Sequence, residues 1–378
     1  MESGDKSATQ PSFKEAIVLR RSCVFALSLA LLLVLSPASF AQDYPNQGRL
    51  ASVMTRNLDA GSDFAYVLAV AQDPGASDFD ILMAITNTYQ EMIQSDIPKR
   101  ADVIVNEIRT HKPDLVALQE VSTLRTGVYN QPPDTVVVDG LQSLLQALDK
   151  KGLHYAAVAV QTNADIALPA FDPYYNPISV GFTDYDVVLA RTDLPLWKLK
   201  ISNIQMKHFD TILPFTLRDQ TIPFYRGWIS MQLTVRQKSY QFVTTHLETF
   251  SMDIQAAQTD ELINGPLVSD LPVVLAGDLN SDAYQPSWDN GPAFQMLQAA
   301  GFEDVWHTLR AWNTGLTWPL FAEDPPGAAK LRQRIDLIMA RGSGLQNKTI
   351  TRTGLSPSPQ GVWASDHAGV LEKFVVLP

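Results

Sequence analysis

The chain has 378 residues, of which 46% are hydrophobic, and it carries a formal net charge of −11 at pH 7. It is therefore long enough for a large core, and its length alone allows two domains. Proteins that bind long nucleic acid usually carry a basic surface, so the acidic balance argues against duplex DNA as the natural substrate. A bound metal would offset part of the local charge, so this argument does not exclude a nuclease.

The first 41 residues have the pattern of an export signal. Basic residues end at Arg21, an apolar run fills residues 24–35, and residues 36–41 offer the small side chains that a signal peptidase requires. The run has about a dozen residues, whereas a membrane-spanning helix needs roughly 20. We expect cleavage after Ala41 by the general secretory route, which predicts a periplasmic or extracellular protein. An uncleaved anchor or a buried helix is the alternative.

The only cysteine, Cys23, would leave with this signal. A mature chain of residues 42–378 would then have no disulfide and no cysteine nucleophile. No segment of that chain is apolar enough to span a membrane.

Five short segments along the chain end in polar side chains, and the fifth follows a looser apolar run than the others. The polar residues, in order, are Asn57, Glu120, His246, Asp278 with Asn280, and Asp366 with His367. Short runs rich in Val and Leu predict buried strands, which would deliver these groups to the rim of a sheet. A lone Glu in this place usually caps a strand in solvent. Five such ends in series predict a cluster that suits a divalent cation and a phosphate.

Helices are predicted in three places between these strand ends. Pro98 opens the first helix and Pro113 ends it, and two more are expected at about residues 255–262 and 293–300. Further apolar runs predict strands at residues 156–160, 187–190, 228–235, 335–339 and 369–376. Strands that alternate with few helices predict a mixed α/β chain with two packed sheets.

Three long connections are expected to form the rim of the site, because long loops in compact domains are often functional. They span residues 59–96, 161–185 and 205–226. The apolar segment of residues 209–215 can contact lipid or pack against the body of the protein, and packing is the plainer interpretation. Because the polar ends run from Asn57 to His367, one site draws on the whole chain, which favours a single domain over residues 42–378.

The residue types indicate separate roles within the cluster. Glu120 and Asn57 suit Mg²⁺, which prefers oxygen ligands and leaves room for substrate phosphate. Asp278 and Asn280 face the same side of an extended segment, where they can accept a proton from water and hold the phosphate. His246 is a second candidate acid or base, with a buried core histidine as the alternative.

Asp336 lies in an apolar strand, which is costly for a carboxylate unless it is paired. We expect it to orient the ring of His367, because a functional histidine usually donates its second ring nitrogen to a carboxylate. A structural ion pair between Asp336 and Arg334 is the alternative.

From Ser52 to Val375, this order of residues resembles the endonuclease/exonuclease/phosphatase family, which includes deoxyribonucleases, abasic-site endonucleases, sphingomyelinases and inositol polyphosphate 5-phosphatases. The positions that match its motifs are Asn57, Glu120, His246, Asp278, Asn280, Asp336, Asp366 and His367. The resemblance implies a four-layered α/β sandwich, with two central mixed β-sheets flanked by helices, and Mg²⁺-dependent phosphoester hydrolysis, with Mn²⁺ as an alternative metal. The histidine at position 246 is absent from abasic-site endonucleases, which argues against a DNA-repair role.

The predicted function is thus that of an exported phosphodiesterase that uses in-line attack by water. Glu120, Asn57 and Asp366 would hold the metal. Asp278 and His367 are both candidates for activating water, and His246 would protonate the leaving oxygen.

The substrate is predicted to be a phospholipid headgroup or a small phosphoester, and a secreted non-specific nuclease is the alternative. An inactive member that acts as a binding protein would lack a motif residue, and none is missing. We expect a monomer.

Overall fold

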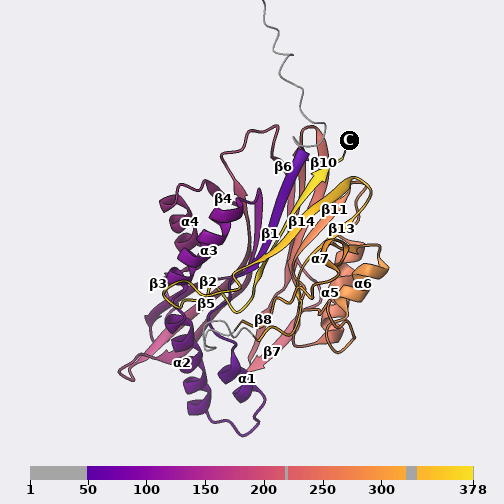
Figure 1. The fold of residues 1–378 in the computed structure, drawn as a ribbon. Helices are drawn as coiled ribbons and strands as arrows, with labels where there is room; N and C mark the ends of the chain where they lie inside the picture. Colours follow the sequence, from indigo (N-terminus) through magenta and orange to yellow (C-terminus); the bar gives the residue numbers. More distant parts are fainter. Residues whose placement is uncertain (1–48, 218–219, 321–329, 378) are drawn as a thin grey trace, which may run out of the picture. The chain divides into compact units, whose positions relative to one another are not determined.

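The computed structural model describes residues 49–217, 220–320 and 330–377, so the expected signal of residues 1–41 lies outside the described residues. No helix in these ranges is long and apolar enough to cross a bilayer. The described elements form two large β-sheets, a two-stranded sheet and seven helices (Figure 1).

The first sheet has seven strands and is mixed. Its path is β14 (Leu345–Thr353), β15 (Gly369–Val376), β1 (Leu50–Asn57), β2 (Leu115–Val128), β5 (Pro177–Arg191) and β4 (Tyr155–Phe171), with β3 (Thr135–Asp139) paired to β2. Only β1 and β2 run parallel. β1 runs parallel to β2 but is shorter, so it ends beside the middle of β2, with Asn57 opposite Gln119.

The second sheet has six strands and repeats this arrangement. Its path is β12 (Glu303–Asp304), β13 (Asp336–Arg341), β11 (Val273–Asp278), β10 (Lys238–His246), β9 (Gly227–Val235) and β6 (Lys200–His208). Here β10 and β11 are the parallel pair, and His246 lies opposite Asp278 in the register. Asp278 also lies opposite Asp336, the first residue of the antiparallel neighbour β13.

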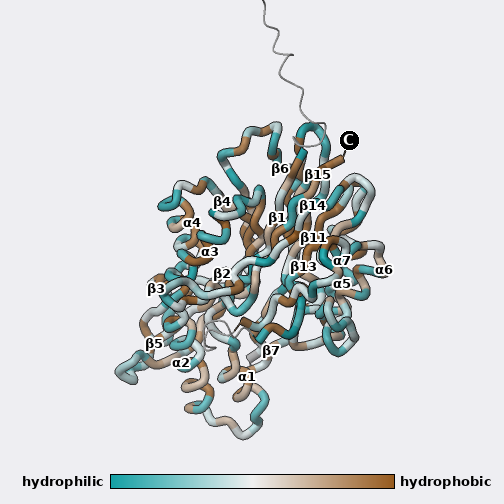
Figure 2. Tube along the Cα trace, in the orientation of Figure 1, coloured by the Kyte–Doolittle hydropathy of each residue, from teal (hydrophilic) through white to brown (hydrophobic). Residues whose placement is uncertain are grey.

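The central strands are buried on both faces, which explains their nearly continuous apolar runs. On β1, Val53 belongs to the core between the sheets, and Met54 belongs to the core on the outer face. On β10, Phe242 and Val243 divide in the same way. Figure 2 shows hydrophobic residues concentrated in these central strands.

Helices complete the layers on the two outer faces. The first sheet is covered by α3 (Ile97–His111) and α4 (Gly140–Lys150), and the second by α5 (Met252–Asn264) and α6 (Ala293–Ala299). The short α7 (Val305–Arg310) packs against β13 and β14. The helices expected near Pro98 and at residues 255–262 and 293–300 are confirmed, as is the α/β fold with two central mixed sheets in a layered sandwich.

The expected long connections are mostly regular structure. Residues 59–96 contain α1 (Ala65–Ala71) and α2 (Asp78–Gln94), which pack on the far parts of β4 and β5. The prediction of a loop over residues 161–185 was wrong, because β4 and β5 form one long antiparallel hairpin there. Alternating burial along that hairpin is interrupted by bulges, which hides the strand pattern in the sequence.

The apolar segment of residues 209–215 packs against the protein. Phe209 is buried in the outer core of the second sheet, and Phe215 packs against the cluster beneath α1 and α2. The segment continues into β7 (Leu213–Leu217), which pairs with β8 (Gln220–Phe224). The packing interpretation therefore holds, and this segment offers little support for lipid contact.

The fifth polar end is not the end of a strand. Residues 361–368 form a loop between β14 and β15, so Asp366 and His367 precede a strand instead of following one. Their run, Gly361 to Ala364, is the least apolar of the five, which is why its prediction as a strand was wrong.

Candidate active site

Glu120 is aimed by a bulge within β2. The pairing of β2 with β5 shifts register between Leu118 and Val121, and Glu120 there has a φ of 57°. Left-handed backbone is uncommon for a residue with a side chain and costs roughly 1–3 kcal/mol. The bulge turns the carboxylate toward the second sheet, where it remains 26% exposed.

Asn57 joins the two sheets at this point. Its Nδ2 donates to Oε1 of Glu120 at 2.8 Å and to Oδ2 of Asp278 at 3.0 Å. Its Oδ1 accepts the backbone N–H of Asp59 at 2.8 Å. Asn57 therefore faces the carboxylates with its N–H groups, because two acceptors flank it and both need a donor.

Asp278 lies at the centre of the cluster. Its Oδ2 is 3.6 Å from Nε2 of His246 and 3.8 Å from Nδ1 of His367, and its Oδ1 accepts the backbone N–H of Asn280 at 2.9 Å. Burial raises the pKa of Asp278 to about 7, and the nearby His367 opposes that shift. A carboxyl that titrates near neutrality can accept a proton from water.

Asn280 is held beside this centre by its side chain. The Nδ2 atom donates to the carbonyl of Leu247 at 2.9 Å, and the backbone of Asn280 is left-handed, with a φ of 47°. An amide nitrogen carries two N–H groups, so this contact orients the amide and uses one of them.

Asp336 and His367 form the pair expected from the sequence, with Nδ1 and Oδ2 2.8 Å apart. The alternative partner, Arg334, makes a bidentate ion pair with Asp304 at 2.9 and 2.6 Å. The guanidinium of Arg334 is therefore neutralised elsewhere.

His367 is surrounded by carboxylates. Burial lowers its pKa, but the charges of Asp336, Asp366 and Asp278 outweigh that effect, so the pKa lies well above its usual value. The backbone carbonyl of His367 accepts a hydrogen bond from the fully buried Arg56. The imidazole is thus both positively charged and fixed in place.

His246 has the opposite environment. Nη1 of Arg226 lies 2.8 Å from Nδ1 of His246, and a guanidinium can only donate. The ring must therefore carry its proton on Nε2, which faces Asp278 and Glu120. Burial lowers the pKa of His246 well below its usual value, and Arg226 and His367 add to the effect. This arrangement suits hydrogen-bond donation better than the proton transfer expected from the sequence.

Asp366 lies at the open side of the cluster, with 36% of its side chain exposed. Its Oδ2 accepts from Nε1 of Trp318 at 3.2 Å and is 3.9 Å from Nε2 of His367. Burial raises the pKa of Asp366 to about 6. Burial also raises the pKa of Glu120, and repulsion from Asp366 adds to that shift.

The residues therefore fit a divalent cation. Glu120 and Asp366 are partly exposed carboxylates that repel each other, and a bound cation would remove this repulsion. Oxygen atoms of Glu120 and Asp278 also lie within 4.8 Å of each other, whereas both ring nitrogens of the neighbouring His246 are already used.

Three arginines that support the site were missed from the sequence. Arg226 fixes His246, Arg56 holds the backbone of His367, and Arg100 pairs with Asp59 at 2.7 Å. The last contact fixes the turn whose Ala60 N–H donates to Oε2 of Glu120 at 2.8 Å. Arg56 directly precedes Asn57, which was a usable signal. The other two sit in segments with no distinguishing pattern.

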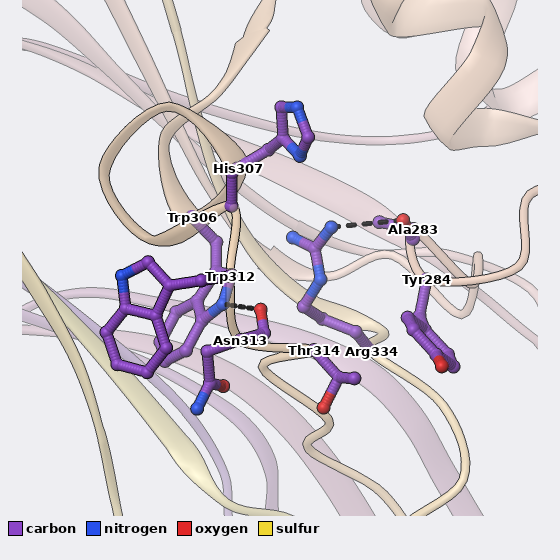
Figure 3. A pocket seen from close by; sticks show the side chains of 9 residues that line it. Ala283, Tyr284, Trp306, His307, Trp312, Asn313, Thr314 and Arg334 are labelled. Carbon is purple, nitrogen blue, oxygen red and sulfur yellow. Dashed lines mark hydrogen bonds between the residues drawn. The ribbon is translucent and has the colours of Figure 1, made fainter.

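A cavity of about 260 Å³ lies beside the segments that follow Asn280 and precede Asp336 (Figure 3). Ala283 and Tyr284, which follow Asn280, line it together with Trp306, Trp312 and Arg334. Its one guanidinium is already paired with Asp304. The cavity thus offers aromatic surface and little free positive charge.

Residues 93–367 match the profile of the Endonuclease/Exonuclease/phosphatase family. The similar solved structures include a family protein from Leptotrichia buccalis C-1013-b, with 14% identity, 86% of this chain and 99% of that chain covered, and a TM-score of 0.52. A family protein from Bacteroides vulgatus has 16% identity, the same coverages and a TM-score of 0.50. Humanized D. rerio TDP2 also has 16% identity and these coverages, with a TM-score of 0.49.

At such identities these likenesses show the fold alone. Comparison with curated protein sequences found no match.

Proposed function

The chain belongs to the endonuclease/exonuclease/phosphatase family, whose members hydrolyse phosphoester bonds, and on this premise we propose that it is a Mg²⁺-dependent phosphodiesterase in which water attacks phosphorus in line. One observation carries the proposal. The side chains of Asn57, Glu120, Asp278, His246 and the His367–Asp336 pair are linked by contacts of 2.8 to 3.9 Å at one edge of both sheets.

Glu120 and Asp366 would hold the metal, and Asn57 would keep Glu120 in position. Both carboxylates are partly exposed, so water and substrate could reach a cation held by them. When bound, Mg²⁺ would polarise a phosphoryl oxygen and offset the negative charge that develops in the transition state. Mn²⁺ has similar ligand preferences and is the expected substitute.

The remaining residues bind the phosphate and move a proton. Asp278 accepts the proton of the attacking water, because its pKa of about 7 allows it to act near neutral pH. The positive His367 presents Nε2–H, and the neutral His246 presents its own Nε2–H, to the phosphoryl and leaving oxygens. Asn280 supplies a further N–H for the phosphate.

We favour a small phosphodiester or a phospholipid headgroup as the substrate. The net charge of −11 disfavours a long polyanion, because phosphate contacts along nucleic acid need a basic surface. The packing of Phe209 and Phe215 removes the sequence argument for a lipid-contacting loop, so the small diester is the first choice. A nuclease is the second candidate.

The test compares substrates under one set of conditions. The purified protein is assayed with Mg²⁺ on bis-p-nitrophenyl phosphate, sphingomyelin vesicles, phosphoinositides and plasmid DNA, each with and without EDTA. We expect metal-dependent cleavage, fastest on a small diester or a headgroup. Fastest cleavage of plasmid DNA would favour the nuclease, and no cleavage of any diester would contradict the proposal.

We also propose export with removal of residues 1–41, on the basic start, the short apolar run and the small residues before Gln42. Mass spectrometry of the protein recovered from outside the cytoplasm should find an N-terminus at Gln42 or within a few residues of it. An intact Met1 in that fraction would contradict the proposal.

A further inference from the structure

Four buried polar side chains lie together on the two longest strands, apart from the proposed catalytic groups. Gln161 and Asn163 come from β4, and Asp184 and Asp186 come from β5, where Gln161 lies directly opposite Asp186. Ala159 and Val188, two residues further along the same strands, belong to the core between the sheets. The four polar side chains therefore continue the inner face of the first sheet.

These side chains have many acceptor atoms and few donors. Each of the four residues is at most 6% exposed. Within the described residues, no hydrogen bond reaches either carboxylate oxygen of Asp186, Oδ1 of Asp184, Oδ1 of Asn163 or Oε1 of Gln161. One contact is made inside the group, from Nδ2 of Asn163 to Oδ2 of Asp184 at 3.1 Å. Five buried oxygens are thus left without a partner in the part of the chain that the structure describes.

The neighbouring Arg226 does not satisfy them. Its Nη1 is used by His246, and its Nε has no partner among the described residues. Burial raises the pKa of Asp184 to about 6 and that of Asp186 well above its usual value, and the charge of Arg226, which makes no ion pair with either, opposes this only in part. Two carboxylates against one guanidinium leave a net negative charge in a buried place, which is costly unless another cation or a proton is added.

We propose that Asp184, Asp186, Asn163 and Gln161 form a binding site for Ca²⁺, separate from the catalytic metal. The donor set would consist of two carboxylates, the amide carbonyl of Gln161, and the carbonyl of Asn163 once its amide turns over from the contact with Asp184. These are the hard oxygen ligands that Ca²⁺ takes from proteins in groups of six to eight, completed by water. Mg²⁺ fits less well, because it keeps its own waters and is rarely enclosed by protein oxygens.

The position of this site gives it a structural role. The four residues lie where β4 and β5 extend beyond the sandwich to support α1 and α2. Arg226, whose charge acts on both aspartates, contacts His246. A cation there would join the two strands and leave Arg226 free to hold His246. The site would thus act through Arg226, as a positioning element for the catalytic cluster.

The test isolates this site from the catalytic one by using Glu120→Gln, which removes the main catalytic carboxylate. Chelator-stripped Glu120→Gln protein is titrated with Ca²⁺ or Mg²⁺ by calorimetry, its bound metal is counted by elemental analysis, and its melting temperature is recorded. We expect one Ca²⁺ per chain and a rise of about 5 °C in Tm at 100 times the Kd, with a smaller effect of Mg²⁺.

Three further variants in this background locate the site. Asp186→Asn should lose the bound Ca²⁺ and the Ca²⁺-dependent rise in Tm. Gln161→Met keeps the side-chain volume and the charge but removes one ligand, so it should weaken Ca²⁺ binding by about tenfold or more, and it gives a second readout if Asp186→Asn does not fold. Asp165→Asn, on the same strand with its carboxylate 66% exposed, is the control. It breaks the ion pair with Arg125 but should leave Ca²⁺ binding and the Ca²⁺-dependent rise in Tm unchanged.

Two results would overturn the proposal. Ca²⁺ retained by both Asp186→Asn and Gln161→Met would place the cation elsewhere. No bound Ca²⁺ in the Glu120→Gln protein, with Asp186→Asn melting higher than its parent in chelator, would mean that Asp186 is simply a buried protonated acid.

Discussion

His246 and His367 lie on either side of Asp278, and their surroundings drive them to opposite charge states. The charges of three carboxylates outweigh burial and raise the pKa of His367, which favours a positive ring, whereas burial and the charge of Arg226 lower the pKa of His246, which favours a neutral one. Opposite shifts of this kind suit two hydrogen-bond donors of different charge beside a carboxylate that accepts a proton. The assignment of the two rings therefore depends on their partners, Asp336 and Arg226.

The first prediction tests the partnership of Asp336 with His367. His367→Ala should reduce kcat by on the order of 10³-fold or more, because it removes a charged donor from the phosphate site. Asp336→Asn should cost less, and it should cost little more when His367 is already Ala, because the two act as one unit. The rates and melting temperatures of both single variants and the double variant provide the measurement.

Asp304→Asn is the matched control for this cycle. It makes the same substitution in a buried carboxylate, but the partner is Arg334, and breaking that pair should cost about 3–5 kcal/mol of stability. Its effect on rate should add to that of His367→Ala. Additivity for Asp336→Asn as well would show that Asp336 does not serve His367.

The second prediction concerns Arg226. Arg226→Met removes the donor at Nδ1 and one of the charges that oppose protonation of His246, so the pKa of His246 should rise. A ring that must be neutral is then lost to protonation at higher pH, and the acidic limb of the kcat/KM profile should move to higher pH. The rate at pH 8 should fall by about 10–100-fold, the usual range for such a supporting contact.

Arg226→Lys, which keeps a charged donor, should restore part of the profile. An acidic limb at the same pH in Arg226→Met and in the unchanged protein would mean that Arg226 does not control His246.

At the scale of elements, four of the five predicted polar ends lie on strands. β1, β10 and β11 end at Asn57, His246 and Asp278. The apolar run before each of these residues predicts its position at the end of a strand. Glu120 is different, because it lies within a strand and only the bulge turns it inward. The fifth end is a loop, held by the contact of Arg56 with His367 and of Trp318 with Asp366.

Contacts between distant segments explain what the sequence did not reveal. Arg226 reaches His246 from the turn before β9, and Arg100 reaches Asp59 from α3. Neither arginine stands out in its own segment, because its role comes from a partner that only the folded chain brings near. Residues 161–185 of the β4–β5 hairpin were predicted as a loop because the bulges in these strands break the alternation that signals a strand.

The third prediction concerns Glu372, a carboxylate on β15 whose burial was not predicted from the sequence. Glu372 is 0% exposed, and neither of its oxygens has a hydrogen-bond partner in the described part of the chain. Burial raises the pKa of Glu372 from 4.5 to about 8. The folded state therefore holds a proton that the unfolded state has already released.

The sign of the pH effect follows from that difference in protons. The contribution to stability is complete below about pH 4.5 and is lost as the pH rises to about 8, with a slope of up to about 1.4 kcal/mol per pH unit. Glu372→Gln cannot ionise, so its free energy of unfolding should exceed that of the unchanged protein by about 2 kcal/mol or more at pH 8. Denaturant unfolding from pH 5 to 8.5 measures this difference.

Glu303→Gln is the control for this experiment, because the side chain of Glu303 is exposed and its loss should leave the pH dependence unchanged. Equal pH dependence in the Glu372→Gln variant and the unchanged protein would show that the carboxyl finds a partner or water.

At the scale of the whole molecule, the two sheets each bring one parallel pair of strands to a common edge. Asn57 and Glu120 come from the first sheet, and His246 and Asp278 come from the second. The catalytic groups therefore meet only when the sheets pack face to face, so the core between the sheets sets their separation. This dependence on packing explains why residues spread over about 300 positions of the sequence come together only in the folded chain.

The acidic balance of the molecule makes the cation central to the account. Several carboxylates converge on the cluster, and a phosphate diester would add another negative charge. Without a metal the substrate would be repelled, and the mutual repulsion between Asp366 and Glu120 would also remain. Metal dependence is therefore the property on which the proposed function rests most heavily.

The most direct test is the rate of bis-p-nitrophenyl phosphate hydrolysis by the chelator-stripped protein as Mg²⁺ is added back, measured beside Glu120→Gln and the exposed control Glu303→Gln. We predict that the unchanged protein and Glu303→Gln recover activity with Mg²⁺, and that Glu120→Gln stays at least about 10³-fold slower while melting cooperatively. Hydrolysis in excess chelator at the Mg²⁺-loaded rate, or full activity of Glu120→Gln, would contradict the central claim.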